Sequence, residues 1–349
     1  MLHQTFIPLI DGSNFYCDFR KISAEAQNNI VDPNVISKVE SSGQYILQMS
    51  DSIKTDSLDL ASMRDEMGAT NQDLCTSFID EIPLLVTLTN RKIPITIFRS
   101  PSPKKQKVIV FLHGGGFIGG STKVLKNQCR FLAEQSDAAV ISIDYRLAPE
   151  NPYPAGLNDC KEIILWILKN AKKLKLSPDR ITISGESAGG NFALAISLSK
   201  IGKYVALTIP IYGAIDLTLP SENNYWNYDK YPVIPEHRKY AITRLNRFAN
   251  MNNIIRQLYC LNPNDIKNPE ISPLYAKDFS HLQKVILIEA EYDFFRLSND
   301  LMAQKLMNSN IDCKVIRYQG MDHGFFDRLG YCPQTTDCIL EIAKQVKAL

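Results

Sequence analysis

A serine flanked by glycines is the first group in this sequence that could do chemistry. The motif Gly185-Glu186-Ser187-Ala188-Gly189 follows an apolar run and precedes an apolar segment of helical character. In a G-x-S-x-G motif between a strand and a helix, the glycines allow a turn too sharp for bulky side chains. That turn exposes the serine at the carboxyl edge of a sheet. The motif alone arises often by chance, but its strand–turn–helix context makes Ser187 a candidate nucleophile.

A nucleophilic serine needs a histidine that takes its proton and an acid that orients the histidine. When the serine lies on such a turn, the acid and then the histidine follow later in the chain, each just after a strand. His323 follows the strand-like run that ends at Tyr318, and it is the one of the five histidines in the required place. We therefore predict that His323 is the general base. His237 and His281 lie in or beside a strand-free segment and are predicted to be structural.

Several acidic residues compete for the role of orienting His323. Asp293 and Asp216 each lie just past an apolar, strand-like run. Glu289 falls inside its strand pattern, and Asp322 directly precedes His323 and cannot easily turn back to the imidazole ring. We predict Asp293 as the acid and keep Asp216 as its rival.

The glycine run His113-Gly114-Gly115-Gly116 follows another strand-like run. Acyl transfer builds negative charge on the carbonyl oxygen of the substrate, and hydrogen-bond donors must already face that oxygen. Backbone N–H groups of glycine suit this role because no side chain blocks the approach. We predict an oxyanion hole made by the N–H groups of Gly114 and Gly115 together with that of Ala188.

The same glycine run has the G-x-G-x-x-G spacing of a dinucleotide-binding loop, and Asp144 closes the next apolar run as that motif requires. This alternative leaves Ser187, Asp293 and His323 without a role, and its fingerprint begins only at Gly114. We therefore expect no nicotinamide or flavin cofactor, and the predicted triad needs no metal.

Apolar runs and amphipathic segments alternate along the chain and indicate the elements that position these residues. Segments 157–174 and 298–308 have the length and pattern of amphipathic helices. Short buried strands that alternate with helices favour a mainly parallel sheet covered on both faces. We predict an α/β fold with a mostly parallel eight-stranded sheet, helices on both faces and a helical cap. The predicted strands are 84–89, 95–98, 108–112, 139–143, 181–184, 205–212, 285–290 and 314–318.

Two segments break this alternation. Residues 1–80 are polar and helix-prone without a strand pattern, and residues 221–282 contain no strand and are too long for a simple connection. We interpret both segments as parts of a helical cap. The predicted divisions are an N-terminal cap segment 1–80, a first core part 81–220, a cap insertion 221–282 and a second core part 283–349.

Aromatic side chains are dense in the cap insertion, at Tyr225, Trp226, Tyr228 and Tyr231. Such rings would narrow a pocket, and no long exposed apolar helix marks a lid that works at a lipid interface. We therefore expect short acyl chains of roughly two to eight carbons, because each added methylene favours binding only while it meets an apolar wall.

Six groups of residues carry a resemblance to a known family. They are His113-Gly114-Gly115-Gly116-Phe117, Asp144-Tyr145-Arg146-Leu147-Ala148-Pro149-Glu150, Pro152-Tyr153-Pro154-Ala155, Gly185-Glu186-Ser187-Ala188-Gly189-Gly190, Asp293, and His323-Gly324-Phe325. From about residue 105 to residue 330, the chain resembles the hormone-sensitive-lipase-like branch of the α/β-hydrolase carboxylesterases. The resemblance implies a serine carboxylesterase that acts on small to medium acyl esters without a cofactor. It also implies that Asp144 braces the fold and binds no ribose.

Two positions depart from the family pattern. Glu186 stands where the family commonly has Asp, and Phe294-Phe295-Arg296-Leu297 stands where it often has Pro-Leu-Arg-Asp. Two alternatives stay open. A small-molecule amidase or deacetylase would use the same triad. The family also includes a plant hormone receptor, so a non-catalytic ligand receptor is the second alternative, although the intact triad argues against it.

The composition suits a globular protein whose partner is a small-molecule ester. Lys and Arg number 39 and Asp and Glu 37, so the net charge is +2, and nothing indicates nucleic acid or an anionic membrane surface as a partner. No run approaches the ~20 apolar residues of a membrane span, and the N-terminus lacks a signal-peptide pattern. The eight cysteines form no C-x-x-C pair. We expect mostly free thiols in a cytoplasmic protein, with a Cys332–Cys338 disulfide as the alternative. The sequence does not decide between a monomer and a homodimer.

Overall fold

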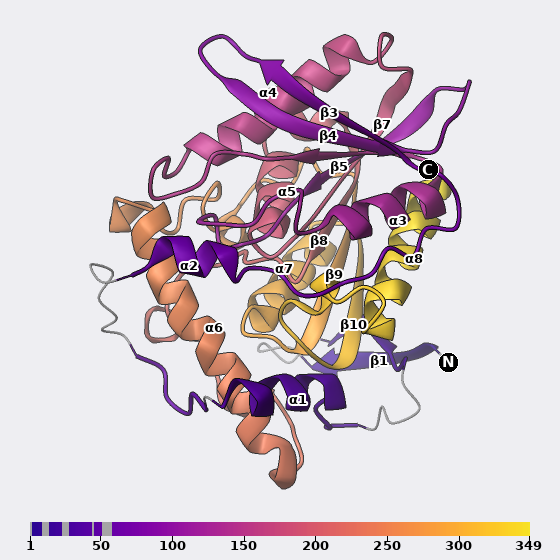
Figure 1. Ribbon diagram of the computed structural model, residues 1–349. Coiled ribbons are helices and arrows are strands. Elements are labelled where there is room, and N and C mark those ends of the chain that lie inside the picture. The colour runs from indigo at the N-terminus through magenta and orange to yellow at the C-terminus, as the bar shows by residue number, and fades with distance from the viewer. Residues whose placement is uncertain (1, 9–13, 23–27, 44, 51–57) are drawn as a thin grey trace.

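The computed structural model describes residues 2–8, 14–22, 28–43, 45–50 and 58–349 of the chain. The described strands join in a single sheet (Figure 1). They are β1 (Leu2–Pro8), β2 (Asn14–Arg20), β3 (Asp80–Thr87), β4 (Lys92–Arg99), β5 (Gln106–Leu112), β6 (Ala139–Ile143), β7 (Leu176–Glu186), β8 (Val205–Ile211), β9 (Lys284–Tyr292) and β10 (Asp312–Asp322).

The strand order across the sheet is β1-β2-β10-β9-β8-β7-β5-β6-β4-β3. From β2 to β6 every neighbouring pair is parallel, whereas β1 at one edge and β4 and β3 at the other join in antiparallel pairs. Parallel strands direct their carboxyl ends to the same edge of the sheet, which is where ligands bind in such folds. Residues that follow β5, β7, β9 and β10 can therefore meet at that edge.

Helices cover both faces of the sheet (Figure 1). The α-helices of the described residues are α1 (Pro33–Ser42), α2 (Leu60–Asp65), α3 (Lys126–Ser136), α4 (Ala155–Asn170), α5 (Ala188–Leu198), α6 (Arg238–Tyr259), α7 (Arg296–Asn308) and α8 (Pro333–Lys347). Residues of α3 and α8 belong to one apolar core, and residues of α4, α5 and most of α7 belong to the cores of the opposite face.

Alternation along the strands produces these separate cores, because successive side chains of a strand point to opposite faces. On β5, Ile109 and Phe111 pack with α3 and α8, whereas Val108 and Val110 pack with α4 and α5. All four side chains are fully buried or nearly so. A strand buried on both faces must be apolar at every position, which is the pattern seen in the sequence.

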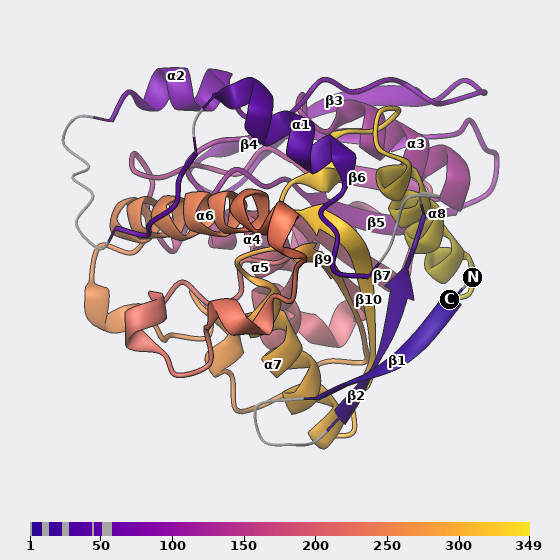
Figure 2. The same cartoon turned by 90° about the horizontal axis from the view of Figure 1, so that it is seen from below.

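The mostly parallel sheet with helices on both faces is confirmed, but the described residues form a sheet of ten strands where eight were expected. The eight predicted strands are all present, and β1 and β2 add to the edge beside β10 (Figure 2). The prediction of a helical segment without strands was therefore wrong for these first residues. In β2, Cys17 pairs with Val315 and is fully buried, while Asp18 forms an ion pair with Arg20. Each of these two strands is only 7 residues long, so the polar composition of the whole segment concealed them.

The cap insertion contributes α6, which packs against α1 from the N-terminal segment, and both views of the molecule show the two helices side by side (Figures 1 and 2). No strand occurs among the described residues between β8 and β9. The division of the chain into core and cap segments stays a prediction. The 3₁₀ turns are Lys200–Tyr204, Pro220–Glu222, Tyr228–Lys230, Pro235–His237, Pro263–Asp265, Pro273–Tyr275 and Phe325–Asp327.

Two further features concern the chain as a whole. Within the described ranges, no helix is both long enough and apolar enough to cross a membrane. All eight cysteines are free thiols, so Cys332 and Cys338 are not joined.

Candidate active site

Ser187 occupies the sharp turn between the end of β7 and the start of α5. Its φ of 55° lies in the left-handed region that non-glycine residues rarely adopt. Two glycines make this turn sterically feasible. A Cβ atom at Gly185 would lie 2.6 Å from the carbonyl oxygen of Leu112, and one at Gly189 would overlap the same oxygen. Because β5 passes so close to the turn, larger residues at these two positions would push the serine out of place.

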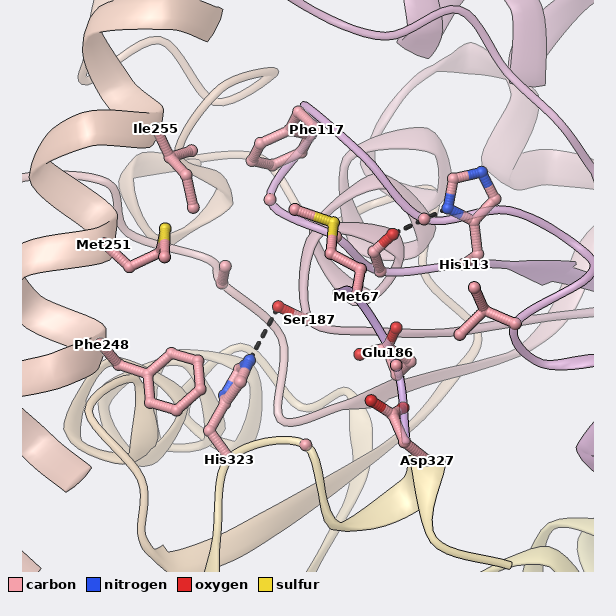
Figure 3. A pocket seen from close by; sticks show the side chains of 18 of the residues that line it. Met67, His113, Phe117, Glu186, Ser187, Phe248, Met251, Ile255, His323 and Asp327 are labelled. Atoms are coloured by element: carbon pink, nitrogen blue, oxygen red, sulfur yellow. Dashed lines mark hydrogen bonds between the residues drawn. The ribbon is translucent and has the colours of Figure 1, made fainter. Parts of the chain in front are cut away.

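The structure brings Ser187, His323 and Asp293 together. Ser187 Oγ lies 2.8 Å from His323 Nε2 (Figure 3). On the other side of the ring, His323 Nδ1 lies 2.7 Å from Asp293 Oδ2. The three residues follow β7, β10 and β9, so one edge of the sheet positions all of them. All three are buried, and Ser187 is the most accessible at 9% exposure. A serine, a histidine and a carboxylate in a hydrogen-bonded row form the arrangement that activates a hydroxyl for attack.

The Asp293 carboxylate is held on the side away from the histidine. Its Oδ1 accepts a hydrogen bond from the N–H of Phe295 at 2.8 Å. The phenol of Tyr231 donates to the backbone carbonyl of Asp293, also at 2.8 Å. These contacts leave Oδ2 directed at His323, so the acid reaches the imidazole without needing to rearrange.

Asp216, the rival acid, has a different set of partners. It accepts hydrogen bonds from the phenol of Tyr225 at 2.6 Å and from the backbone and side chain of Thr218 at 2.9 Å. The phenol of Tyr275 lies 3.3 Å from the same carboxylate. Asp216 therefore anchors the loop that follows β8 and has no hydrogen bond to His323 in the described structure.

The remaining acids are also engaged elsewhere. Glu289 lies inside β9 and pairs with Arg317 at 2.7 Å. Asp322 pairs with Arg244 at 2.6 Å and with Arg328 at 2.7 Å. Burial opposes ionisation of Asp322, yet the two guanidinium groups hold its pKa well below the usual range. Asp322 is thus the counter-ion of two arginines beneath the site.

The glycine loop after β5 lines the cavity beside Ser187. Gly115 and Gly116 have φ values of 109° and 61°, which glycine adopts without strain. The carbonyl of Gly115 accepts a hydrogen bond from the N–H of Gly119 at 2.9 Å, which closes the loop. Within the described chain, the N–H groups of Gly115, Gly116 and Ala188 have no hydrogen-bond partner. The two glycines line the same cavity as Ser187.

Gly114 is placed differently from its neighbours. A Cβ atom at Gly114 would overlap the carboxyl group of Glu186, so this carboxyl group packs directly against the Gly114 backbone. Burial, reinforced by the nearby Asp327, raises the pKa of Glu186 well above its usual value. Figure 3 shows the Glu186 and Asp327 carboxyl groups as neighbours at the floor of the site. In the sequence, Glu186 was noted only as a departure from the family pattern. Its contacts with Gly114 and Asp327 join segments that are far apart in the sequence.

Arg64 stabilises the outer side of the glycine loop through a hydrogen bond. Its Nε donates to the carbonyl of Ile118 at 2.6 Å, and its Nη2 donates to the carbonyl of Ala148 at 2.9 Å. The same guanidinium forms an ion pair with Glu150 at 2.6 Å. A single side chain at the end of α2 therefore ties the glycine loop to the segment that follows β6. No spacing pattern in the sequence pointed to this residue.

A cavity of about 330 Å³ opens at Ser187 and His323 (Figure 3). Side chains from α2 and the residues after it, from the glycine loop and from α6 form its apolar wall. These side chains include Met63, Met67, Phe117, Phe248, Met251 and Ile255. The charged residues of the lining are Lys38, Glu66, Glu186, Arg244, Arg247 and Asp327.

The four aromatic residues that were expected to narrow the pocket are not part of this lining. Trp226 donates its indole N–H to the carbonyl of Phe294 at 3.1 Å, and Tyr231 contacts the backbone of Asp293. The segment therefore packs behind the loop that carries the acid, so the expectation about its role was wrong. Side-chain direction in a helical insertion depends on tertiary contacts that the sequence does not reveal.

Asp144 lies apart from the cavity lining. It accepts a hydrogen bond from the N–H of Thr122 at 2.7 Å, and its own N–H donates to the carbonyl of Pro94 at 3.0 Å. These bonds connect three segments of the core. Across the described residues, no group of three or more His, Cys, Asp or Glu side chains is arranged to hold a metal ion.

Comparison with known proteins gives consistent matches. A family model described as alpha/beta hydrolase fold matches residues 109–327, a range that includes Ser187, Asp293 and His323. An arylesterase of Saccharolobus solfataricus is 30% identical over 268 residues, which cover 75% of this chain and 82% of that protein. An arylacetamide deacetylase of Mus musculus is 25% identical over 300 residues, which cover 71% of this chain and 73% of that protein.

The fold also matches solved structures. A hyperthermophilic esterase from the archaeon Pyrobaculum calidifontis has a TM-score of 0.68 and is 28% identical, with 83% of this chain and 88% of that chain covered.

Proposed function

The chain belongs to the α/β-hydrolase family, within its hormone-sensitive-lipase-like esterase branch, and we propose that it is a serine carboxylesterase. The observation that carries this proposal is the hydrogen-bonded row of Ser187, His323 and Asp293 at the base of an apolar cavity. A non-catalytic receptor on the same fold would have no use for this row.

The geometry supports a two-step reaction. Ser187 Oγ attacks the ester carbonyl carbon while its proton moves to Nε2 of His323. Asp293 holds the Nδ1–H tautomer and stabilises the imidazolium that forms. The tetrahedral intermediate then collapses, the alkoxide leaves with the proton from Nε2, and an acyl-enzyme remains on Ser187. Water, deprotonated by His323, attacks the acyl carbon, and the carboxylic acid and free serine are released.

We propose that the oxyanion of both tetrahedral intermediates is bound by the N–H groups of Gly115, Gly116 and Ala188. These donors lack other partners, and each such donor lowers the barrier by about 3 kcal/mol in comparable enzymes. Gly114 was assigned this role in the sequence analysis, and that assignment stays a prediction. We favour Gly116 because the Gly114 backbone lies directly against the carboxyl group of Glu186. Since Glu186 precedes Ser187, this contact couples the positions of the two halves of the site.

The cavity supports substrates of small to medium size. Its volume of about 330 Å³ lies at the lower end of the range for small-molecule sites, and its wall is largely apolar.

The similarity to an arylacetamide deacetylase supports amide hydrolysis as a second candidate, since the same triad serves both reactions. We propose esters as the principal substrates, since an alkoxide is a better leaving group than an amide anion. The free thiols support the cytoplasm as the place of action.

The test is hydrolysis of p-nitrophenyl esters by the wild-type protein and by Ser187→Ala, beside an aryl amide of the same acyl group. We expect the ester kcat to fall by several orders of magnitude in Ser187→Ala. Ser221→Ala, at an exposed serine outside the site, is the matched control. Near-wild-type ester hydrolysis by Ser187→Ala would show that the serine mechanism is wrong, and faster turnover of the amide would make the protein an amidase.

A further inference from the structure

Three cationic side chains line one side of the cavity that holds the nucleophile. Lys38 comes from α1, and Arg244 and Arg247 come from successive turns of α6, which packs against α1. Lys38 is partly buried and Arg244 is fully buried, whereas Arg247 lies at the exposed rim. The proposed hydrolysis of a neutral ester does not require any of these charges.

Arg244 already has its counter-ion. Its Nε lies 2.6 Å from Asp322, and its guanidinium also lies over the ring of Phe248 at 5.0 Å. Asp322 is shared with Arg328 at 2.7 Å, so its negative charge is matched by two guanidinium groups. The pair therefore leaves a positive excess at this end of the cavity.

Lys38 and Arg247 have no such partner. Neither forms an ion pair with any carboxylate in the part of the chain that the structure describes. The charges that act on Lys38 are Asp322, Arg244, Arg328 and Asp327, and burial lowers its pKa to about 8. A partly desolvated ammonium group without a partner is unfavourable in an empty site, and a bound anion would relieve that cost.

The acids of the lining form no ion pair with Lys38 or Arg247 among the described residues. Burial raises the pKa values of Glu186 and Asp327. Glu66 acts on Arg247 through space, but the two groups form no ion pair. The cavity wall thus combines an apolar surface with two cationic side chains that have no ion-pair partner in the described part of the chain.

We propose that Lys38 and Arg247 bind a carboxylate group carried by the ester substrate, so that the preferred substrates are acidic esters. This inference rests on the proposed function, since it concerns the substrate of the same Ser187. The carboxylate belongs either to the acyl part, as in a monoester of a dicarboxylic acid, or to the alcohol part, as in an ester of a hydroxy acid. Ammonium and guanidinium groups form strong charge-assisted hydrogen bonds with carboxylates.

The experiment compares matched acidic and neutral esters. Monoethyl adipate and ethyl hexanoate have acyl chains of equal carbon number and differ in a terminal carboxylate. 6-Butanoyloxyhexanoate and hexyl butanoate form the corresponding pair for the alcohol part. The quantity measured is the ratio of kcat/KM for the acidic ester to that for the neutral ester, because this ratio cancels effects that are common to both substrates.

The wild-type protein is expected to favour the acidic member of at least one pair. Lys38→Met and Arg247→Met should each lower that ratio about tenfold, the effect of losing one charged hydrogen-bond partner. The double variant should lose less than the product of the two single effects if both groups bind one carboxylate. Arg247→Lys should restore most of the ratio, and Lys173→Met, at an exposed lysine outside the cavity, should leave it unchanged.

A ratio that changes less than twofold in both single variants would overturn the proposal. If Lys38→Met does not fold, as judged by circular dichroism and thermal melting, Lys38→Gln takes its place. If the proposed esterase function itself is wrong, the wild-type protein will hydrolyse neither member of either pair. This result differs from failure of the acidic-ester inference. Failure of the present inference alone would leave hydrolysis of the neutral esters intact.

Discussion

The carboxyl group of Glu186 lies directly against the backbone of Gly114, in a space that a single methyl group at position 114 would fill. Glu186, which precedes Ser187, thus supports the glycine loop that follows β5. Burial and the proximity of Asp327 raise the pKa of Glu186 well above its usual value, so the contact is made by a buried carboxyl group whose ionisation is disfavoured.

Replacement of Glu186 should separate the effect of shape from that of charge. Glu186→Gln keeps the size and an uncharged polar end, so we expect kcat within about threefold of the wild type at pH 7. Glu186→Ala leaves a cavity beneath Gly114, and we expect kcat to fall by about 10²-fold, with little change in KM, as is typical when oxyanion donors are displaced.

The pH profile supplies a measurement that a purely structural role would not change. Because the pKa of Glu186 is raised, the acid is neutral at lower pH and ionises as the pH rises. The wild-type kcat should therefore decline on the alkaline side, and Glu186→Gln should lack that decline. Identical profiles for the two proteins would contradict the role assigned to Glu186.

Asp293→Asn should reduce kcat about 10⁴-fold, because an amide at this position holds the wrong imidazole tautomer in the comparable protease. Asp216→Asn should leave kcat within about tenfold of the wild type. Its amide nitrogen cannot accept the hydrogen bonds from Tyr225 and Thr218, so the free energy of unfolding should fall by about 1–3 kcal/mol. Steady-state kinetics and urea unfolding on both variants check the pair, and a larger kinetic loss in Asp216→Asn would transfer the acid role.

The preference for acidic esters should depend on pH through Lys38. The pKa of Lys38 is lowered to about 8, so the ammonium form is present below that pH and is lost above it. The ratio of kcat/KM for acidic over neutral ester should thus fall about tenfold between pH 7 and pH 9.5. Lys38→Met should show a low ratio across the whole range, and a wild-type ratio that stays constant would count against Lys38 as the carboxylate ligand.

Acyl-chain length gives a further prediction. We expect kcat/KM for p-nitrophenyl esters to peak between about two and eight carbons, since each methylene adds about 0.8 kcal/mol only while the wall of the cavity receives it. The basis is now the cavity of about 330 Å³ and not the aromatic residues of the insertion. An optimum at twelve carbons or more, or activation at a lipid–water interface, would show that the pocket extends beyond the described cavity.

The sequence predicted those parts of the site that depend on short backbone motifs. Ser187 was identifiable because Gly185 and Gly189 permit only one kind of turn, and His323 and Asp293 because each follows an apolar run. The parallel arrangement of the inner strands was predicted from the alternation of buried runs with helices, although the count missed β1 and β2.

Features that depend on contacts between distant segments could not be predicted. The contact of Glu186 with Gly114, the clamp made by Arg64 and the position of Lys38 beside α6 all join segments far apart in the sequence. Trp226 was misplaced for the same reason, since its partner Phe294 lies 68 positions away. The spacing of residues along the sequence does not show which distant segments come into contact.

The parallel pairing of β2 with β10 has a consequence for biosynthesis. Cys17 lies opposite Val315, so the first of these strands is translated about 300 residues before its neighbour. Because synthesis proceeds at roughly 5–20 residues per second, β2 waits on the order of 15 seconds or more for β10. During that time β1 can pair with one edge of β2, while the other edge stays open to a chaperone. The edge formed by β1 and β2 can therefore join the rest of the sheet only after β10, which ends at Asp322, has been synthesised.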